Sequence, residues 1–191
     1  MIVAGIGTDV GKSVVAAILT TLFEGAYWKP IQCGPEPMEP LLGSLPIYPP
    51  AYRLKASSSP HQAAKIDPAA IVLPKSKRTL IVESCGGLLV PLTPHFTTLD
   101  LFSEWSLPWI VVSRHYLGSI NHTLLTLEVL KQRKVKILGL IFNGEPDLEK
   151  EKAILNLSNV PLLNRLLPEA AICRNTIERY AKLWSGTPLP K

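Results

Sequence analysis

The sequence has few cysteines and no long apolar run, and each absence excludes a class of protein. The three cysteines are an odd number without close pairing, which argues against a disulfide framework and favours a reducing compartment. There is no Cys-x-x-Cys pair that would suggest a zinc site. No apolar run could cross a bilayer, and no basic segment followed by an apolar one marks a secretion signal. We therefore expect a cytoplasmic protein without a membrane partner.

Charged residues are also sparse, at 18% of the chain against 47% hydrophobic residues, so we expect an ordered chain. The net charge is +5, and the densest basic group, Lys131, Arg133, Lys134 and Lys136, is typical of a solvated helix end. No aromatic residues interleave with this group, so we expect no nucleic-acid partner. A small polyanion such as ATP fits a modest positive excess equally well.

Strands and helices alternate along the 191 residues, a length that fits one domain, 1–191, with a frayed tail at 186–191. The segment from Cys33 to Pro60 is rich in proline and serine, and it predicts a long functional loop with at most short elements. The expected strands are Ile2–Gly5, Tyr27–Ile31, Leu80–Glu83, Trp109–Ser113, Ile137–Phe142 and Pro161–Leu166. The expected helices are Lys12–Phe23, Ser119–Arg133, Leu148–Leu157 and Thr176–Trp184.

This alternation predicts an α/β fold, with a mostly parallel central sheet that is covered by helices on both faces. Ligands of such sheets bind at the carboxyl ends of the strands. In this chain the rule selects the segments 5–13, 29–34, 83–87 and 113–121, together with Asn143.

A glycine-rich loop lies between the first expected strand and the first helix, with the sequence Gly5-Ile6-Gly7-Thr8-Asp9-Val10-Gly11-Lys12-Ser13. Its backbone N–H groups and the helix N-terminus suit phosphates. Lys12 can reach the β- and γ-phosphates, and Ser13 can bind Mg²⁺. The strict pattern of a P-loop, the Walker A motif, has glycine where this chain has Ile6, and Gly5 makes the loop one residue longer. We predict a P-loop that binds a nucleoside triphosphate.

An acidic residue follows the apolar strand Leu80-Ile81-Val82 at Glu83, as in a Walker B element. The alternative is a surface glutamate at a strand end. The carboxyl end of a buried strand favours the metal ligand, because Mg-ATP needs carboxylates near its phosphates. The small residues after it, Ser84, Cys85, Gly86 and Gly87, permit close approach of a ligand.

Together these segments resemble the dethiobiotin synthetase family over nearly the whole chain. The shared features are the P-loop and five further motifs in family order: Tyr27-Trp28-Lys29-Pro30-Ile31-Gln32-Cys33-Gly34, Ser59-Pro60-His61, Val82 to Gly87, Leu117 to His122, and Asn143. The joint occurrence of these motifs is far more specific than the P-loop alone. The match is looser at Val82 to Gly87.

The resemblance implies that the chain is an ATP-dependent enzyme, a ligase of biotin biosynthesis that uses Mg²⁺. The substrates would be 7,8-diaminopelargonic acid, CO₂ (or bicarbonate) and ATP, and the products dethiobiotin, ADP and phosphate. The family also implies a homodimer in which one subunit helps to bind the substrate of the other. Negative charge develops on oxygen in each step, and fixed cations stabilise such charge best.

The resemblance assigns a role to each matching position. Lys12 and Lys29 would be catalytic, Lys12 on the transferred phosphoryl group and Lys29 on the carbamate. The metal ligands would be Ser13, Glu83 and Glu39. The substrate would contact Thr8, Lys29, Cys33, Leu117, Gly118, Ser119 and Asn121. ATP would contact Asp9, Val10, Gly11, Lys12, Ser13, Val14, Glu83, Ser84, Cys85, Gly86, Asn143, Gly144, Leu167 and Pro168.

The chain departs from the family pattern at several positions. Members carry a Mg²⁺-binding aspartate after the glycine that Gly34 matches, whereas this chain has no aspartate between Asp9 and Asp67. Glu36 or Glu39 could replace it, Glu39 being better placed, or neither does. Cys33 replaces the serine that is usual in the family, and a thiol is a poorer hydrogen-bond partner than a hydroxyl. On the adenine side, Leu162 to Leu166 replaces a version with glycine.

Two alternatives to the enzyme stay open. One is a nucleotide-dependent switch of the partitioning type, which carries an extra lysine early in the P-loop, where this chain has Gly7. The other is a degenerate relative that binds nucleotide without turning over the diamine. The missing aspartate favours it, and the presence of Lys12, Lys29 and Glu83 argues against it.

Overall fold

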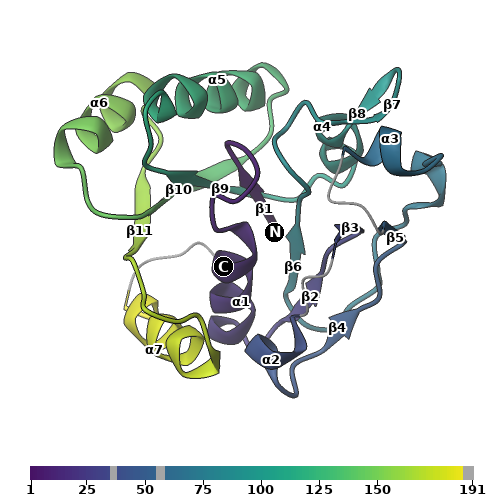
Figure 1. Ribbon diagram of the computed structural model, residues 1–191, viewed down its shortest axis with the longest axis horizontal. Helices are drawn as coiled ribbons and strands as arrows, with labels where there is room; N and C mark the ends of the chain where they lie inside the picture. The colour runs from purple at the N-terminus through teal and green to yellow at the C-terminus, as the bar shows by residue number, and fades with distance from the viewer. Residues whose placement is uncertain (35–37, 55–58, 187–191) are drawn as a thin grey trace.

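The computed structural model describes residues 1–34, 38–54 and 59–186. Within them, seven strands form one parallel sheet (Figure 1). In spatial order they are β11 (Leu162–Leu166), β10 (Ile137–Asn143), β9 (Trp109–Arg114), β1 (Ile2–Gly5), β6 (Leu80–Glu83), β2 (Ala26–Trp28) and β4 (Ile47–Tyr48). This sheet confirms the predicted fold class. Apart from Gly186, the tail that we expected to be frayed lies outside the described residues.

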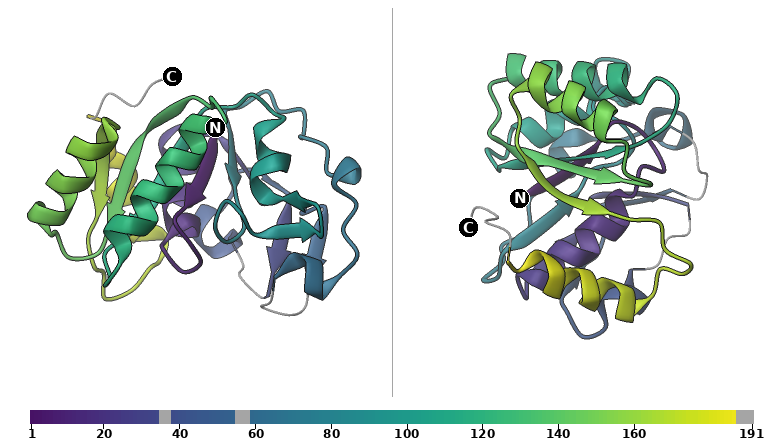
Figure 2. Two further views of the ribbon diagram at one scale, coloured as in Figure 1. Left: turned by 90° about the horizontal axis from the view of Figure 1, so that it is seen from above. Right: turned by 90° about the vertical axis from the view of Figure 1, so that its left-hand side faces the viewer.

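Helices cover both faces of the sheet, as Figure 2 shows. One layer consists of α1 (Lys12–Leu22), α2 (Glu39–Leu42) and α7 (Arg174–Trp184). The other consists of α4 (Thr98–Ser103), α5 (Ser119–Gln132) and α6 (Leu148–Ser158). Because side chains alternate along a strand, Val3 packs in the α1 layer while Ile2 and Ala4 pack in the α5 layer. Burial on both faces explains why these strands are continuous apolar runs.

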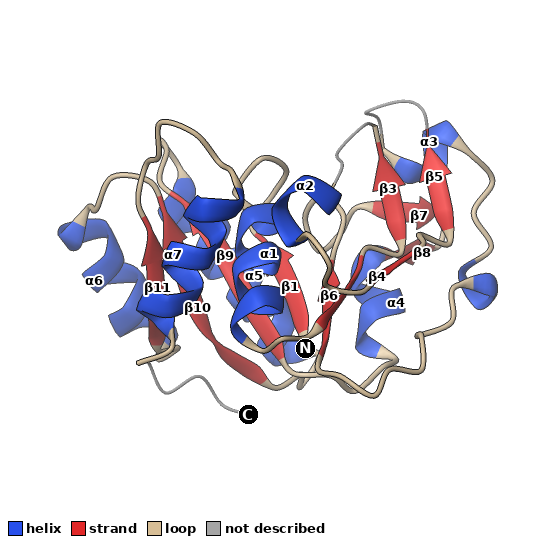
Figure 3. Ribbon diagram, turned by 90° about the horizontal axis from the view of Figure 1, so that it is seen from below, coloured by secondary structure: helices blue, strands red, loops and turns tan. Residues whose placement is uncertain are grey.

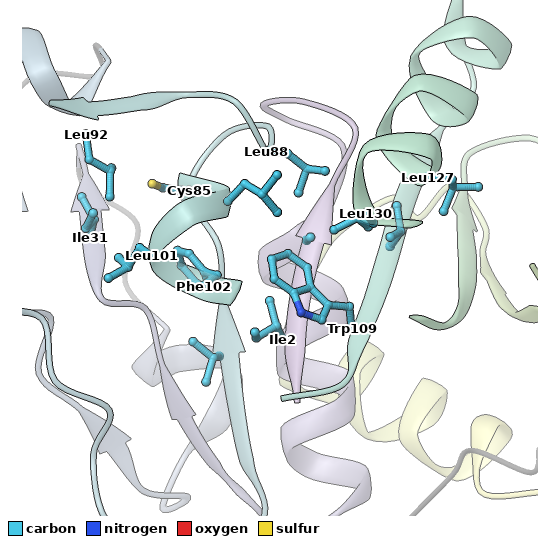
Figure 4. Close-up of a cluster of buried hydrophobic side chains, with 14 of the residues drawn as sticks. Ile2, Ile31, Cys85, Leu88, Leu92, Leu101, Phe102, Trp109, Leu127 and Leu130 are labelled. Atoms are coloured by element: carbon cyan, nitrogen blue, oxygen red, sulfur yellow. The ribbon is translucent and has the colours of Figure 1, made fainter. Parts of the chain in front are cut away.

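The core on the α5 side centres on large aromatic side chains (Figure 4). Trp109 of β9 and Phe102 of α4 are each 1% exposed, and their ring centroids lie 6.3 Å apart at an angle of 62°. Leu127 and Leu130 of α5 belong to the same buried cluster. Apolar burial of this kind supplies most of the stabilisation of the sheet.

The predicted strand Tyr27–Ile31 is wrong as a single element. The structure divides it at Lys29 and Pro30 into β2, in the central sheet, and β3 (Ile31–Cys33), in a separate sheet with β5 (Tyr52–Leu54). Proline has no N–H to donate to a strand neighbour, so it ends the pairing of β2. The Pro30 carbonyl instead accepts a bond from the Tyr52 N–H at 3.0 Å. This break turns the chain at the carboxyl edge of the sheet.

The segment after β3 contains only short elements, namely α2, β4 and β5, as predicted for the described part of Cys33–Pro60. Five further short elements lie in the described residues: α3 (Pro60–Ala63), the 3₁₀ turn η1 (Pro68–Ala70), β7 (Pro91–Thr93), β8 (Phe96–Thr97) and α4. The antiparallel pair β7–β8 lies beside β3 and β5 at one end of the molecule (Figure 3). None of the helices in the described ranges has the length and apolarity that a bilayer crossing demands.

Candidate functional site

The P-loop connects β1 to the first residue of α1. Gly11 caps the helix at a left-handed φ of 96°, and a Cβ there would lie 2.4 Å from Asn143 Nδ2. Gly5 carries a second constraint, because a Cβ on it would lie 2.6 Å from Val10 Cγ2. Real Cβ atoms do not approach other atoms so closely, so both positions favour glycine. The crowding at Gly5 explains why glycine stands at this position.

Two neighbouring strands hold the loop from outside. Asn143, the last residue of β10, donates from Nδ2 to the Val10 carbonyl at 2.9 Å. Arg114, paired with Asn143 at the end of β9, donates from Nη1 to the Asp9 carbonyl at 3.2 Å. The C=O and N–H of a trans peptide point in opposite directions, so the next N–H groups face away from these anchors. The loop is thus oriented for an anion by fixed peptide groups.

Lys12 lies inside the loop and is 7% exposed. Its Nζ donates to the Gly7 carbonyl at 2.6 Å, which curls the side chain back over the loop. The ammonium therefore lies among the peptide groups that would surround phosphates.

Glu83 ends β6 with a carboxylate that is 1% exposed. Ser13 Oγ donates to its Oε1 at 2.8 Å, Lys29 Nζ forms an ion pair with the same oxygen at 2.9 Å, and Tyr27 OH donates to Oε2 at 2.6 Å. A buried carboxylate is tolerable only with such partners. The structure thus brings Ser13, Lys29 and Glu83 together.

Sequence reasoning missed Tyr27 as part of this group. The signal was present, because Tyr27 and Lys29 are two residues apart and so point to the same side of an extended chain. Strand β2 also pairs with β6, with Tyr27 opposite Ile81, which places Tyr27 diagonal to Glu83. Without the strand order, the partner of the hydroxyl could not be chosen.

A cleft of about 680 Å³ opens over these groups at the carboxyl edge of the sheet. It collects predicted residues from three segments and adds three to which no role was assigned, Ser59, Pro60 and Val90. The predicted residues that line it are Thr8, Asp9, Gly11, Lys12, Ser13, Val14, Lys29, Cys33, Glu83, Ser84, Cys85 and Gly86. The volume suits a ligand of small-molecule size.

Oxygen atoms in this cleft fit Mg²⁺. Ser13 Oγ and Glu83 Oε1 are hard ligands that lie 2.8 Å apart beside the P-loop. Glu39 is exposed at the start of α2 and is not among the described residues that line the cleft, so its metal role stays a prediction. Glu36 lies outside the described residues. Within the described ranges no cluster of three or more His, Cys, Asp or Glu residues could hold a metal.

The two cysteines of the cleft are poor nucleophiles. Burial raises the pKa of the Cys85 thiol to about 12, and burial also raises the pKa of Cys33 against the opposing charge of Lys29. Both thiols are therefore protonated at neutral pH, which leaves Cys33 as a weak hydrogen-bonding group.

Other predicted residues lie at the ends of neighbouring elements. Gly144 follows β10, and its N–H donates to the Leu166 carbonyl at 3.0 Å, while the Leu167 N–H donates to Tyr180 OH at 3.1 Å. Leu167 and Pro168 follow β11 and are exposed. These positions share the edge of the sheet on which Asn143 contacts the P-loop.

The stretch from Leu117 to Asn121 opens α5 and is not among the described residues that line the cleft. Leu117 is fully exposed, Gly118 caps the helix with a φ of 96°, Ser119 is buried and Asn121 is exposed. Within the chain, these residues and the cleft residues form separate groups.

Comparisons with known proteins found a family model and curated relatives. A family model described as an AAA domain matches residues 1–175. Three curated relatives are named ATP-dependent dethiobiotin synthetase BioD. The one from Chlamydia abortus is 43% identical over 197 residues, covering 98% of this chain and 95% of the relative. Those from Rhodopseudomonas palustris and Agrobacterium fabrum are 44% and 42% identical, covering 87% and 88% of this chain and 84% and 86% of the relatives.

Solved structures share the fold at low sequence identity. MinD from Pyrococcus horikoshii, complexed with Mg-ADP, has a TM-score of 0.59 at 20% identity, over 96% of this chain and 88% of that one. A plasmid partition protein from Borrelia burgdorferi bound to AMPPNP has a TM-score of 0.59 at 15% identity, over 96% and 93%. At these identities the likeness concerns the P-loop fold alone. The match of the curated relatives over nearly the whole length establishes that the chain belongs to the ATP-dependent dethiobiotin synthetase family.

Proposed function

We propose that this protein closes the ureido ring of dethiobiotin, using 7,8-diaminopelargonic acid, CO₂ and ATP in biotin synthesis. One amine of the substrate adds to CO₂ and loses a proton, which gives a carbamate. The γ-phosphoryl group passes to a carbamate oxygen, and ADP leaves. The second amine attacks the carbamoyl carbon, forms the second C–N bond and releases phosphate and a proton.

The observation that carries this proposal is the second lysine of the cleft. A P-loop needs Lys12 for phosphates, but Lys29 enters the same cleft from the end of β2 and meets Glu83 at 2.9 Å. A cation there can stabilise the negative carbamate and its phosphorylated form. The diamine would lie along Thr8, Lys29 and Cys33, which line one cleft. Holding both amines against one carbon supplies much of the rate.

Nucleotide phosphates fit the other part of the cleft. The loop from Asp9 to Val14 would surround them, with Lys12 on the transferred group. Ser13 and Glu83 would hold Mg²⁺, which when bound offsets the charge on the phosphate oxygens. The adenine would lie towards Asn143, Gly144, Leu167 and Pro168, at the ends of β10 and β11.

We propose that a second copy of the chain completes the site. A fully exposed leucine at position 117, next to the exposed cap residue Gly118 of α5, suits an interface better than water. The N-terminus of α5 would receive the substrate carboxylate in the partner's site, because the positive end of the helix dipole there attracts anions. The separation of this stretch from the cleft within one chain supports the two-chain site.

Formation of ADP and dethiobiotin by the purified protein tests the reaction, with the diamine, bicarbonate and Mg-ATP supplied. We expect both products in equal amounts, and neither without the diamine. ADP without dethiobiotin would point to a switch or to another acceptor. Saturable nucleotide binding without turnover would instead identify a degenerate relative.

A further inference from the structure

Tyr27 contacts the carboxylate of Glu83, the proposed metal ligand, but does not itself line the cleft. Tyr27 is 3% exposed and packs in the apolar cluster between β2, β6 and α1. It is not among the described residues that line the cleft, so its effect on a ligand would pass through Glu83. The phenol hydroxyl donates to Glu83 Oε2 at 2.6 Å, a short distance typical of a charge-assisted bond.

The two oxygens of Glu83 have different partners. Oε1 accepts a hydrogen bond from Ser13 Oγ and forms the ion pair with Lys29 Nζ, and both of these residues line the cleft. Oε2 accepts a hydrogen bond from the hydroxyl of Tyr27, which lies in the core. The two oxygens are chemically equivalent, so a half-turn of the carboxylate would only exchange them, but any smaller rotation would break the bond to Tyr27. The hydroxyl therefore holds the plane of the carboxylate and keeps one oxygen towards the cleft.

We propose that Tyr27 is a positioning residue that fixes Glu83 for the metal of the Mg-nucleotide. This inference rests on the proposed function, because it takes Ser13 and Glu83 as the metal-binding pair. Partners that orient a ligating carboxylate typically change metal affinity or activity by about 10–100-fold when they are removed. Tyr27 fits this role because its ring is held by packing while its hydroxyl is aimed at one oxygen.

Tyr27→Phe tests the inference, since it keeps the ring and removes the hydroxyl. Binding of a non-hydrolysable ATP analogue is measured by calorimetry over a series of Mg²⁺ concentrations, with no diamine present. We expect the Mg²⁺ concentration for half-maximal enhancement of binding to rise about tenfold or more, with Mg²⁺-free binding little changed. A merely structural role would lower the thermal midpoint and leave the Mg²⁺ titration in place.

Tyr48→Phe is the matched control. Tyr48 lies on β4, next to β2, and its hydroxyl donates to the Lys75 carbonyl at 3.1 Å, outside the cleft. We expect the Mg²⁺ titration of the Tyr48→Phe protein to match that of the wild type. A folded Tyr27→Phe protein with the wild-type Mg²⁺ titration would overturn the inference alone. A wild-type protein whose nucleotide binding ignores Mg²⁺ would overturn the proposed metal pair, and the inference with it.

If Tyr27→Phe does not fold, 3-fluorotyrosine at position 27 replaces it. This residue keeps the ring and the hydroxyl but makes the phenol a stronger donor to Glu83. A Mg²⁺ requirement that differs from that of the wild type supports the positioning role, and an identical requirement overturns it.

Discussion

Lys29 brings a second positive charge into the cleft from the residue that follows β2. Pro30 ends the pairing of β2, so the chain leaves the central sheet at the point where the ammonium meets Glu83. The side chain of Lys29 is 11% exposed, so little water screens its charge. A cation in such a position is suited to stabilise charge that develops on a bound oxygen.

Lys29→Ala should lower kcat for dethiobiotin formation by at least about 10²–10³-fold, the loss typical of one group that stabilises a developing oxyanion. Binding of the ATP analogue should change little, because Lys12 and the loop peptides remain. Steady-state kinetics and calorimetry give the two values, and Lys65→Ala, on an exposed residue, is the control. Turnover that survives the change would remove Lys29 from the mechanism.

Cys33→Ser should lower the KM for the diamine by about 2–10-fold, because a hydroxyl is a stronger hydrogen-bond partner than a protonated thiol. The thiol of Cys33 lines the cleft, and burial raises its pKa. Initial rates over a range of diamine concentrations give the KM, and Cys173→Ser, outside the cleft, is the control. A KM that rises or stays constant would show that position 33 does not bind the substrate.

At the scale of the element, α4 was missed although its sequence carries a start signal. Thr97 and Asp100 form a capping box, in which the Thr97 hydroxyl accepts from the Asp100 N–H and the Asp100 carboxylate accepts from the Thr97 N–H. Asp100 also forms an ion pair with Arg133 at 2.8 Å, which connects α4 to the end of α5. Part of the basic group predicted at a helix end is therefore paired.

Asp100→Asn should lower the free energy of unfolding by up to about 1 kcal/mol at neutral pH, because it removes the charge of the partly exposed ion pair with Arg133. Burial raises the pKa of Asp100, but the hydrogen bonds from Thr97 and the Arg133 guanidinium lower it by more, to below its usual value. The carboxylate thus stabilises the fold above its ordinary pKa, and this contribution is lost as the pH falls through the lower, folded value. Urea unfolding over a series from about pH 7 downwards should show a difference between the two proteins that shrinks as the pH falls.

Helix α6 is held to the sheet by a buried charge that no sequence pattern revealed. Glu151 is 2% exposed, accepts from Arg165 Nε of β11 at 2.8 Å and lies 3.2 Å from His115 Nε2. The His115 ring also stacks on Phe142. The carboxylate thus connects three elements, α6, β11 and the loop after β9.

Arg165→Ala should reduce the free energy of unfolding by about 3 kcal/mol, because it leaves Glu151 buried beside a weaker partner. Lys150→Ala is the matched control on the same helix, since its ion pair with Asp147 is exposed to solvent and contributes little to stability. Urea denaturation measures both values. Equal losses in the two variants would contradict the importance of the buried pair.

At the scale of the whole molecule, we propose that a second copy of the chain completes the substrate site. Leu117 is exposed in the single chain, so Leu117→Asp should leave the packing of the single chain intact and weaken the proposed dimer. Sedimentation should show more monomer, and the KM for the diamine should rise because the N-terminus of α5 no longer reaches the partner's site. A wild-type protein that is monomeric and fully active would exclude the two-chain site. That residues 1–191 form one domain also stays a prediction.

The sequence by itself determined the fold class and most of the cleft. Buried parallel strands are continuous apolar runs, and Gly5 and Gly11 of the P-loop stand where a Cβ would collide with a neighbour. Both features can be recognised from the residue types of a short stretch of sequence. Ser13, Lys29 and Glu83 were predictable because the carboxyl ends of parallel strands meet at one edge.

Only the tertiary structure decided which side chains pair across that edge. The bond from Tyr27 to Glu83, the anchoring of the loop by Arg114 and Asn143, and the contacts of the buried Glu151 all depend on strand order and register. These contacts join residues far apart in the chain. Local pattern fixes the face that a side chain occupies, but the partner on that face is set by which strands lie side by side.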